Sequence, residues 1–76
     1  MPNGYKEAKI GNYDGELPTV GFREGDTVQV LLDKAGLTLA EGQSINDRNG
    51  NNVQPTDRAV DGSTYYIVAN YKQGRN

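Results

Sequence analysis

The clearest hydrophobic pattern in the chain lies in the segment 25–36, where apolar residues recur at the spacing of one helical face. Four of them follow one another at i, i+3, i+4 and i+7: Val28, Leu31, Leu32 and Ala35. This spacing puts the four side chains on one side of an α-helix. The segment therefore predicts a single amphipathic helix of about three turns.

Residues at both ends of this segment are typical of helix termini. Asp26 and Gln29 have the spacing of a capping box, and Gly36 suits the left-handed position that ends many helices. An alternative stays open, because Val28 and Val30 also alternate as they do in a strand. Residues 20–30 would then be continuous β structure in a small, strand-rich dimeric regulator.

Two extended segments, 5–10 and 17–22, precede the predicted helix. They flank the sequence Asn12-Tyr13-Asp14-Gly15, in which Asp-Gly supplies the positive-φ turn chemistry of a β-hairpin. Pro18 donates no backbone hydrogen bond, so we expect the second strand to lie at an edge of the sheet or next to a bulge.

The segment after the helix predicts a short strand pair. Residues 44–48 form a weak strand candidate, 49–52 a tight turn, and Val53 begins the return. The segment 54–61 is polar and irregular, and Ala59 and Val60 are its expected core contacts.

Residues 64–69, Thr-Tyr-Tyr-Ile-Val-Ala, form the strongest predicted strand, because they are rich in aromatic and β-branched residues. Both alternating sets of side chains are apolar or aromatic. We therefore expect this strand to be central and either covered on both faces or exposing one face to a partner. One of Tyr65 and Tyr66 should fill the core together with Phe22, and the other is the better interface candidate.

A hairpin, one helix, a short strand pair and a strong last strand is the element order of the β-grasp fold. That fold belongs to the α+β class and packs a mixed sheet of four or five strands on one helix. The second half of the chain resembles the small sulfur carriers of thiamine and molybdopterin synthesis. The resembling stretches are Gly25-Asp26-Thr27-Val28 before Leu31-Leu32, the Asn49-Gly50 turn before Val53, and Asp61-Gly62-Ser-Thr-Tyr-Tyr-Ile-Val.

The element order implies a single β-grasp domain over residues 1–70, and the resemblance covers roughly residues 20–70 of it. Residues 71–76 are expected to form a flexible C-terminal tail. The sulfur carriers end in Gly-Gly, whose terminal carboxylate is adenylated and then thiolated. This chain ends in Gln73-Gly74-Arg75-Asn76 instead. The resemblance therefore supports the fold more than it supports the carrier activity.

Composition narrows the function further. A chain of 76 residues has room for one core, and it contains no Cys and no His. The usual catalytic base and the usual soft nucleophile are therefore missing, as are the common zinc ligands. Ten carboxylates against eight Lys and Arg give a net charge of −2, with no basic run that would neutralise phosphates. We expect no enzymatic activity, no cofactor and no nucleic-acid partner.

Residues 1–10 contain no apolar stretch like the core of a secretory signal, and no window approaches the ~20 apolar residues of a membrane span. We therefore expect a cytoplasmic protein with no membrane partner.

A calcium-like motif, Asp47-x-Asn49-x-Asn51, matches the start of an EF-hand loop. The sixth position of such a loop is normally Gly and is Asn52 here, and the twelfth is normally Glu and is Arg58. The missing bidentate carboxylate favours a polar turn without a metal.

These observations predict a non-catalytic, ubiquitin-like adaptor that binds a protein partner as a monomer. Its candidate partner-binding residues lie on the last strand and the tail: Tyr65, Tyr66, Val68, Tyr71, Lys72, Gly74 and Arg75. The alternative functions are a sulfur carrier or modifier-like protein that is activated after trimming to Gly74, and the strand-rich dimeric regulator.

Overall fold

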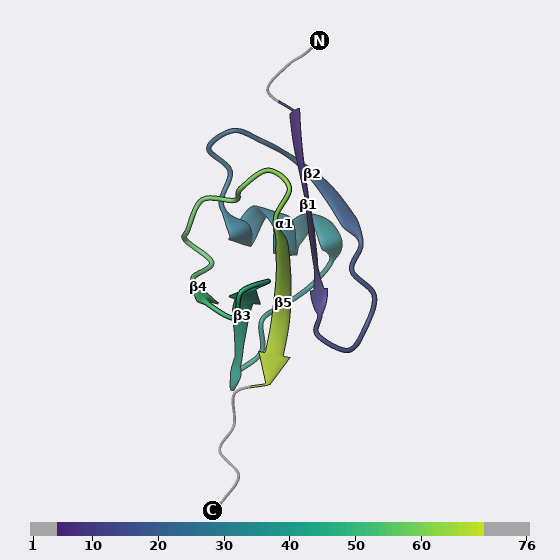
Figure 1. The fold of residues 1–76 in the computed structure, drawn as a ribbon, viewed down its shortest axis with the longest axis vertical. Coiled ribbons are helices and arrows are strands. Elements are labelled where there is room, and N and C mark those ends of the chain that lie inside the picture. Colours follow the sequence, from purple (N-terminus) through teal and green to yellow (C-terminus); the bar gives the residue numbers. More distant parts are fainter. Residues whose placement is uncertain (1–4, 70–76) are drawn as a thin grey trace, which may run out of the picture.

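The computed structural model describes residues 5–69 of the chain. They form five strands and one helix, in the order β1 (Tyr5–Asn12), β2 (Thr19–Arg23), α1 (Val28–Ala35), β3 (Gln43–Asp47), β4 (Asn52–Val53) and β5 (Thr64–Ala69). The strands form one sheet in the order β2-β1-β5-β3-β4 (Figure 1). β1 and β5 are parallel, and the other neighbouring pairs are antiparallel.

This arrangement confirms the predicted α+β class and the β-grasp order of elements. β5 is the central strand, and β2 is an edge strand, as Pro18 indicated. The alternative of continuous β structure over 20–30 is wrong, because β2 ends at Arg23 and α1 begins at Val28. Within residues 5–69, no helix is long and apolar enough to cross a membrane.

The core lies between α1 and one face of the sheet. α1 packs against β1 and β2, and in Figure 1 it lies behind them. Ten apolar side chains are buried there: Ala8, Ile10, Val20, Phe22, Val28, Leu31, Leu32, Ile45, Tyr65 and Ile67. The predicted helical face and the predicted core pair of Phe22 with one tyrosine are thus confirmed.

The start of α1 is capped by a distant loop rather than by its own side chains. The first helical N–H groups need acceptors outside the helix. The N–H of Val28 donates to the carbonyl of Asp57 at 2.9 Å, and that of Gln29 donates to the carbonyl of Pro55 at 2.9 Å. The expected capping box is wrong, because the Asp26 carboxylate accepts from the N–H of Arg23 instead.

The segment between β4 and β5 therefore has a structural role despite its polar sequence. Ala59 packs against the core, as expected. Val60 does not, since its side chain is 58% exposed. Its N–H donates to the hydroxyl of Tyr65 at 3.1 Å in a part-buried position, so the backbone of Val60, and not its side chain, contacts the core tyrosine.

The end of α1 follows the sequence expectation. Gly36 has a φ of 73°, in the left-handed region, and the N–H of Leu37 closes the last turn on the carbonyl of Leu32 at 2.9 Å. This is the usual way in which a glycine ends a helix.

Candidate functional site

Alternate residues of β5 point to opposite faces of the sheet, as in any strand. Tyr65 and Ile67 point toward α1, and each is 4% exposed. Tyr66 and Val68 point to the opposite side and are half-buried. We call this second side the outer face, because the one helix of residues 5–69 packs on the other side of the sheet.

Three side chains form an aromatic patch on the outer face: Tyr13, Tyr66 and Val68. The rings of Tyr13 and Tyr66 meet edge to face, with centroids 5.7 Å apart and planes at 68°. The backbone supports this contact, since the N–H of Tyr13 donates to the carbonyl of Ile67 at 3.0 Å. All three side chains line one shallow hollow of about 330 Å³ together with Arg48. The patch is a preformed surface on the central strand.

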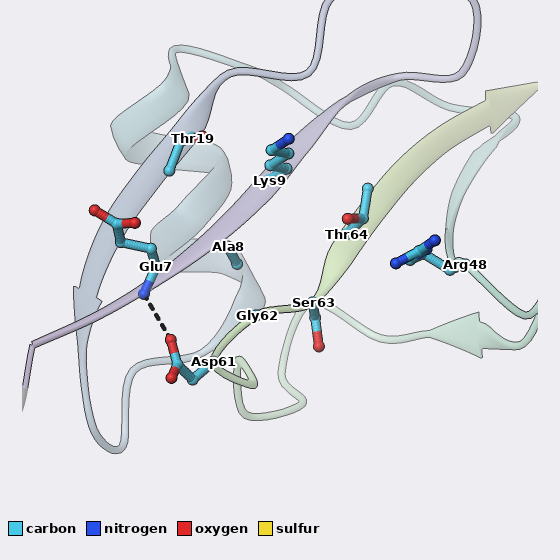
Figure 2. Close-up of a pocket in the computed structure, with 9 residues that line it drawn as sticks. All are labelled: Glu7, Ala8, Lys9, Thr19, Arg48, Asp61, Gly62, Ser63 and Thr64. Atoms are coloured by element: carbon cyan, nitrogen blue, oxygen red, sulfur yellow. Dashed lines mark hydrogen bonds between the residues drawn. The ribbon is translucent and has the colours of Figure 1, made fainter.

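A row of polar side chains crosses the sheet beside this patch. Lys9 of β1 is paired with Thr19 of β2 and with Thr64 of β5. Asp47 pairs with Tyr65, so extending that register by one residue places Arg48 opposite Thr64. Figure 2 shows Thr64 lying between the side chains of Lys9 and Arg48. We call Thr19, Lys9, Thr64 and Arg48 the cationic row.

The cationic row and the aromatic patch are continuous. Lys9, Thr64 and Arg48 line a second hollow, which also measures about 330 Å³. Arg48 lines this hollow and the hollow over the patch as well. The two hollows therefore form one surface with an aromatic part and a cationic part.

Two carboxylates border the cationic hollow on the side away from the patch. Asp61 is held in place, because its Oδ1 accepts from the N–H of Glu7 at 3.0 Å (Figure 2). The N–H of Gly62 donates to the carbonyl of Glu7 at 2.8 Å and fixes the same loop. The Glu7 side chain is exposed on the outer face. The loop before β5 thus holds Asp61 at the border of the cationic hollow.

The free edge of β2 is partly closed. The N–H of Ile10 donates to the carbonyl of Pro18 at 3.2 Å, so the alternating antiparallel pattern turns the main-chain groups of Gly21 and Arg23 away from β1. Lys34 Nζ donates to the carbonyl of Gly21 at 3.0 Å, and the Asp26 carboxylate accepts from the N–H of Arg23 at 3.0 Å. A strand added at this edge would have to displace both side chains.

The calcium-like motif forms a polar turn. Asp47 Oδ1 accepts from the N–H of Asn49 at 2.9 Å and from that of Asn51 at 3.0 Å. This oxygen therefore accepts hydrogen bonds from the backbone of the turn between β3 and β4. Within residues 5–69, no three side chains of His, Cys, Asp or Glu are grouped in a way that could hold a metal ion.

The structure separates the predicted partner-binding residues into three groups. Tyr66 and Val68 come together in the aromatic patch. Tyr65 is in the core and is thereby removed from the candidate surface. The remaining predicted residues lie outside the described residues: Tyr71, Lys72, Gly74 and Arg75.

The sequence interpretation missed Tyr13, Lys9 and Arg48. The sequence places Tyr13 in the hairpin turn, directly after β1 ends at Asn12, yet Tyr13 continues the odd-numbered phase of Lys9. That alternation is a signal for a shared face. Arg48 depends on the pairing of β3 with β5, and no local pattern shows this pairing.

No protein-family model matches this chain, and no curated protein matches it with significant similarity.

Proposed function

We propose that this protein is a non-catalytic, ubiquitin-like adaptor that binds a protein partner through the aromatic patch. The observation that carries the proposal is the position of Tyr66 and Val68 on the central strand, beside the 70%-exposed ring of Tyr13. Tyrosine is enriched at protein interfaces because it buries a large ring and keeps a polar tip. Its two side-chain torsions make it cheap to immobilise.

The surroundings of the patch support binding by the outer face rather than by the free edge of β2. Lys34 and Asp26 occupy main-chain groups on the free edge of β2. The aromatic patch, by contrast, is open and is held by backbone pairing on both sides of β5. Its geometry does not have to be created on binding, which lowers the entropic cost of association.

The burial pattern supports binding rather than side-chain catalysis. Among residues 5–69, no polar or charged side chain is buried. Catalytic acids and bases are commonly tuned by burial and by neighbouring charges in a cleft. The outer face offers an open surface instead.

The test is affinity capture with the intact chain from an extract of its source cells, read by quantitative mass spectrometry. Tyr66→Ser and Val68→Ser should each reduce capture of the specific partner, and we expect about thirtyfold for the tyrosine, the usual effect of losing an aromatic anchor of about 2 kcal/mol. Partner capture within twofold of the parent by both folded variants would contradict the proposal.

Matched controls lie on the same molecule. Tyr5 and Tyr13 are both 70% exposed, but only Tyr13 belongs to the aromatic patch. Tyr13→Ser should therefore weaken capture, whereas Tyr5→Ser should not. Val60, 58% exposed and outside the patch, provides the control for Val68 as Val60→Ser.

The sulfur-carrier alternative rests on Gly74, outside the described residues, and stays a prediction from the sequence. A carrier trimmed to Gly74 should gain an adenylate or thiocarboxylate mass when it is incubated with ATP and an activating enzyme. An adaptor should gain neither, and its capture of the partner should not require removal of Arg75 and Asn76.

A further inference from the structure

We infer that the partner docks through an acidic segment, which places a carboxylate over Lys9 and Arg48 and apolar side chains over the aromatic patch. This inference rests on the proposed function and names the chemistry of the partner. It is carried by the continuity of the two hollows through Arg48.

The two cations are arranged to share one anionic group. The register puts Lys9 and Arg48 on either side of Thr64. Lys9 lies on β1, and Arg48 directly follows β3, the strand on the other side of β5. Figure 2 shows both side chains beside Thr64, whose hydroxyl adds a hydrogen-bond donor. Both cations are exposed and accessible to a partner.

The positive charge of this surface is confined to Lys9 and Arg48, and carboxylates lie on both sides of it. The whole chain carries a net charge of −2, so general electrostatics disfavours an acidic partner. Beyond the patch, the next hollow is lined by Asp14 and contains no cation among its lining residues. Beyond the cationic row lie Glu7 and Asp61. Asp47 also lines the hollow over the patch, but its Oδ1 already accepts from the N–H groups of Asn49 and Asn51. On the outer face of residues 5–69, an acidic group is therefore favoured between Glu7 and Asp61 on one side and Tyr66 on the other.

The strand spacing gives the pattern that the partner segment should have. Thr64, Tyr66 and Val68 are two residues apart, which corresponds to steps of about 7 Å along β5. Apolar side chains should thus follow the carboxylate at about 7 and 13 Å. An extended segment achieves this with positions i+2 and i+4, and a helix approximates it with i+4 and i+8.

The experiment is selection from a randomised library of displayed 12-residue peptides, with the intact chain as bait. We expect the selected peptides to be enriched in Asp or Glu followed by apolar residues at the stated spacing. Synthetic copies should bind the Lys9→Glu/Arg48→Glu variant at least about tenfold more weakly, since each exposed ion pair contributes about two- to fivefold and reversal adds repulsion. Raising the salt from about 50 to about 500 mM should weaken binding to the parent as well.

A second charge-reversed variant controls for net charge. Lys6→Glu/Arg58→Glu makes the same change in charge. Lys6 of β1 is paired with Phe22 of β2, and Arg58 lies in the loop before β5, so neither belongs to the cationic row. It should bind the peptides as the parent does. Circular dichroism of both variants verifies that they are folded.

The outcomes separate this inference from the proposed function. Peptides that depend on Tyr66 but not on Lys9 and Arg48, or that carry no acidic enrichment, overturn the inference and leave the interaction surface standing. Peptides that depend on none of these residues contradict both, as does a selection that returns no binder. Self-association of the parent that Tyr66→Ser abolishes would make a second copy the occupant and would also overturn the inference.

Discussion

The two faces of the sheet differ in what their side chains do. On the face that meets α1, β5 contributes Tyr65 and Ile67, each 4% exposed. On the outer face, the same strand contributes Tyr66 and Val68, which are half-buried and line an open hollow. Neighbouring residues with similar chemistry thus have different roles: Tyr65 and Ile67 stabilise the core, whereas Tyr66 and Val68 form part of the surface. The comparison teaches that an apolar pattern on both sides of a strand does not imply burial on both sides.

The first prediction compares one truncation on the two faces. Ile67→Ala should lower the free energy of unfolding by about 2–5 kcal/mol, because it leaves a cavity in the core. Val68→Ala should cost about 1 kcal/mol or less, since its side chain is already half-solvated. Urea unfolding of both variants measures the difference. Equal costs would mean that the outer face is covered.

A large part of this division is predictable from sequence. The helical face of residues 28–35, the turn at Gly36 and the strength of the last strand all depend on neighbours within a few positions. Their physics is local, so the pattern is sufficient. The same locality applies to Pro18, which predicts a position for β2 at an edge or next to a bulge, and the structure places β2 at an edge.

The features that sequence reasoning missed depend on distant contacts. Residues 55–57 cap α1 only because the chain returns to its N-terminus. Arg48 reaches the outer face beside Lys9 through two different strand pairings. The sequence predicts Val60 in the core, but its side chain is exposed and its N–H donates to the hydroxyl of Tyr65. None of these contacts leaves a periodic signal.

The second prediction concerns how the hairpin loop approaches the outer face. Gly11 is buried, and a Cβ there would collide with the carbonyl oxygen of Glu16. Gly11→Ala should therefore destabilise the protein by about 1–3 kcal/mol, as overpacking does. Gly15→Ala is the control in the same loop. The positive φ expected at the Asp14-Gly15 turn is wrong, because Gly15 is not among the glycines with positive φ, and its Cβ would meet only ordinary contacts. The effect of Gly15→Ala should therefore be near zero or slightly favourable. Thermal unfolding of the two variants tests this, and equal melting temperatures would contradict it.

The third prediction removes single hydroxyl groups from the two faces. Tyr65→Phe leaves the N–H of Val60 without its acceptor, in a half-buried position, and should cost about 0.5–1.5 kcal/mol. Tyr13→Phe keeps the edge-to-face contact with Tyr66 and changes an exposed hydroxyl, so its cost should be smaller than about 0.5 kcal/mol. Hydrogen exchange of the Val60 amide gives a direct readout, because it should accelerate in Tyr65→Phe alone. An unchanged amide would show that this hydrogen bond does not protect it.

The smallest expected effect on stability belongs to the cationic row. Lys9 and Arg48 are exposed. Lys9 is paired with Thr19 and Thr64, and the extended register of β3 and β5 places Arg48 opposite Thr64. Neutralising both in Lys9→Gln/Arg48→Gln should change the free energy of unfolding by less than about 0.5 kcal/mol, as is usual for surface positions. The same variant should bind acidic peptides more weakly, because exposed charges act on association and its salt dependence. Urea unfolding and peptide titration on one preparation measure both quantities. A loss of stability comparable to that of Ile67→Ala would show that the row supports the fold, and the contrast between a stabilising face and a binding face would then disappear.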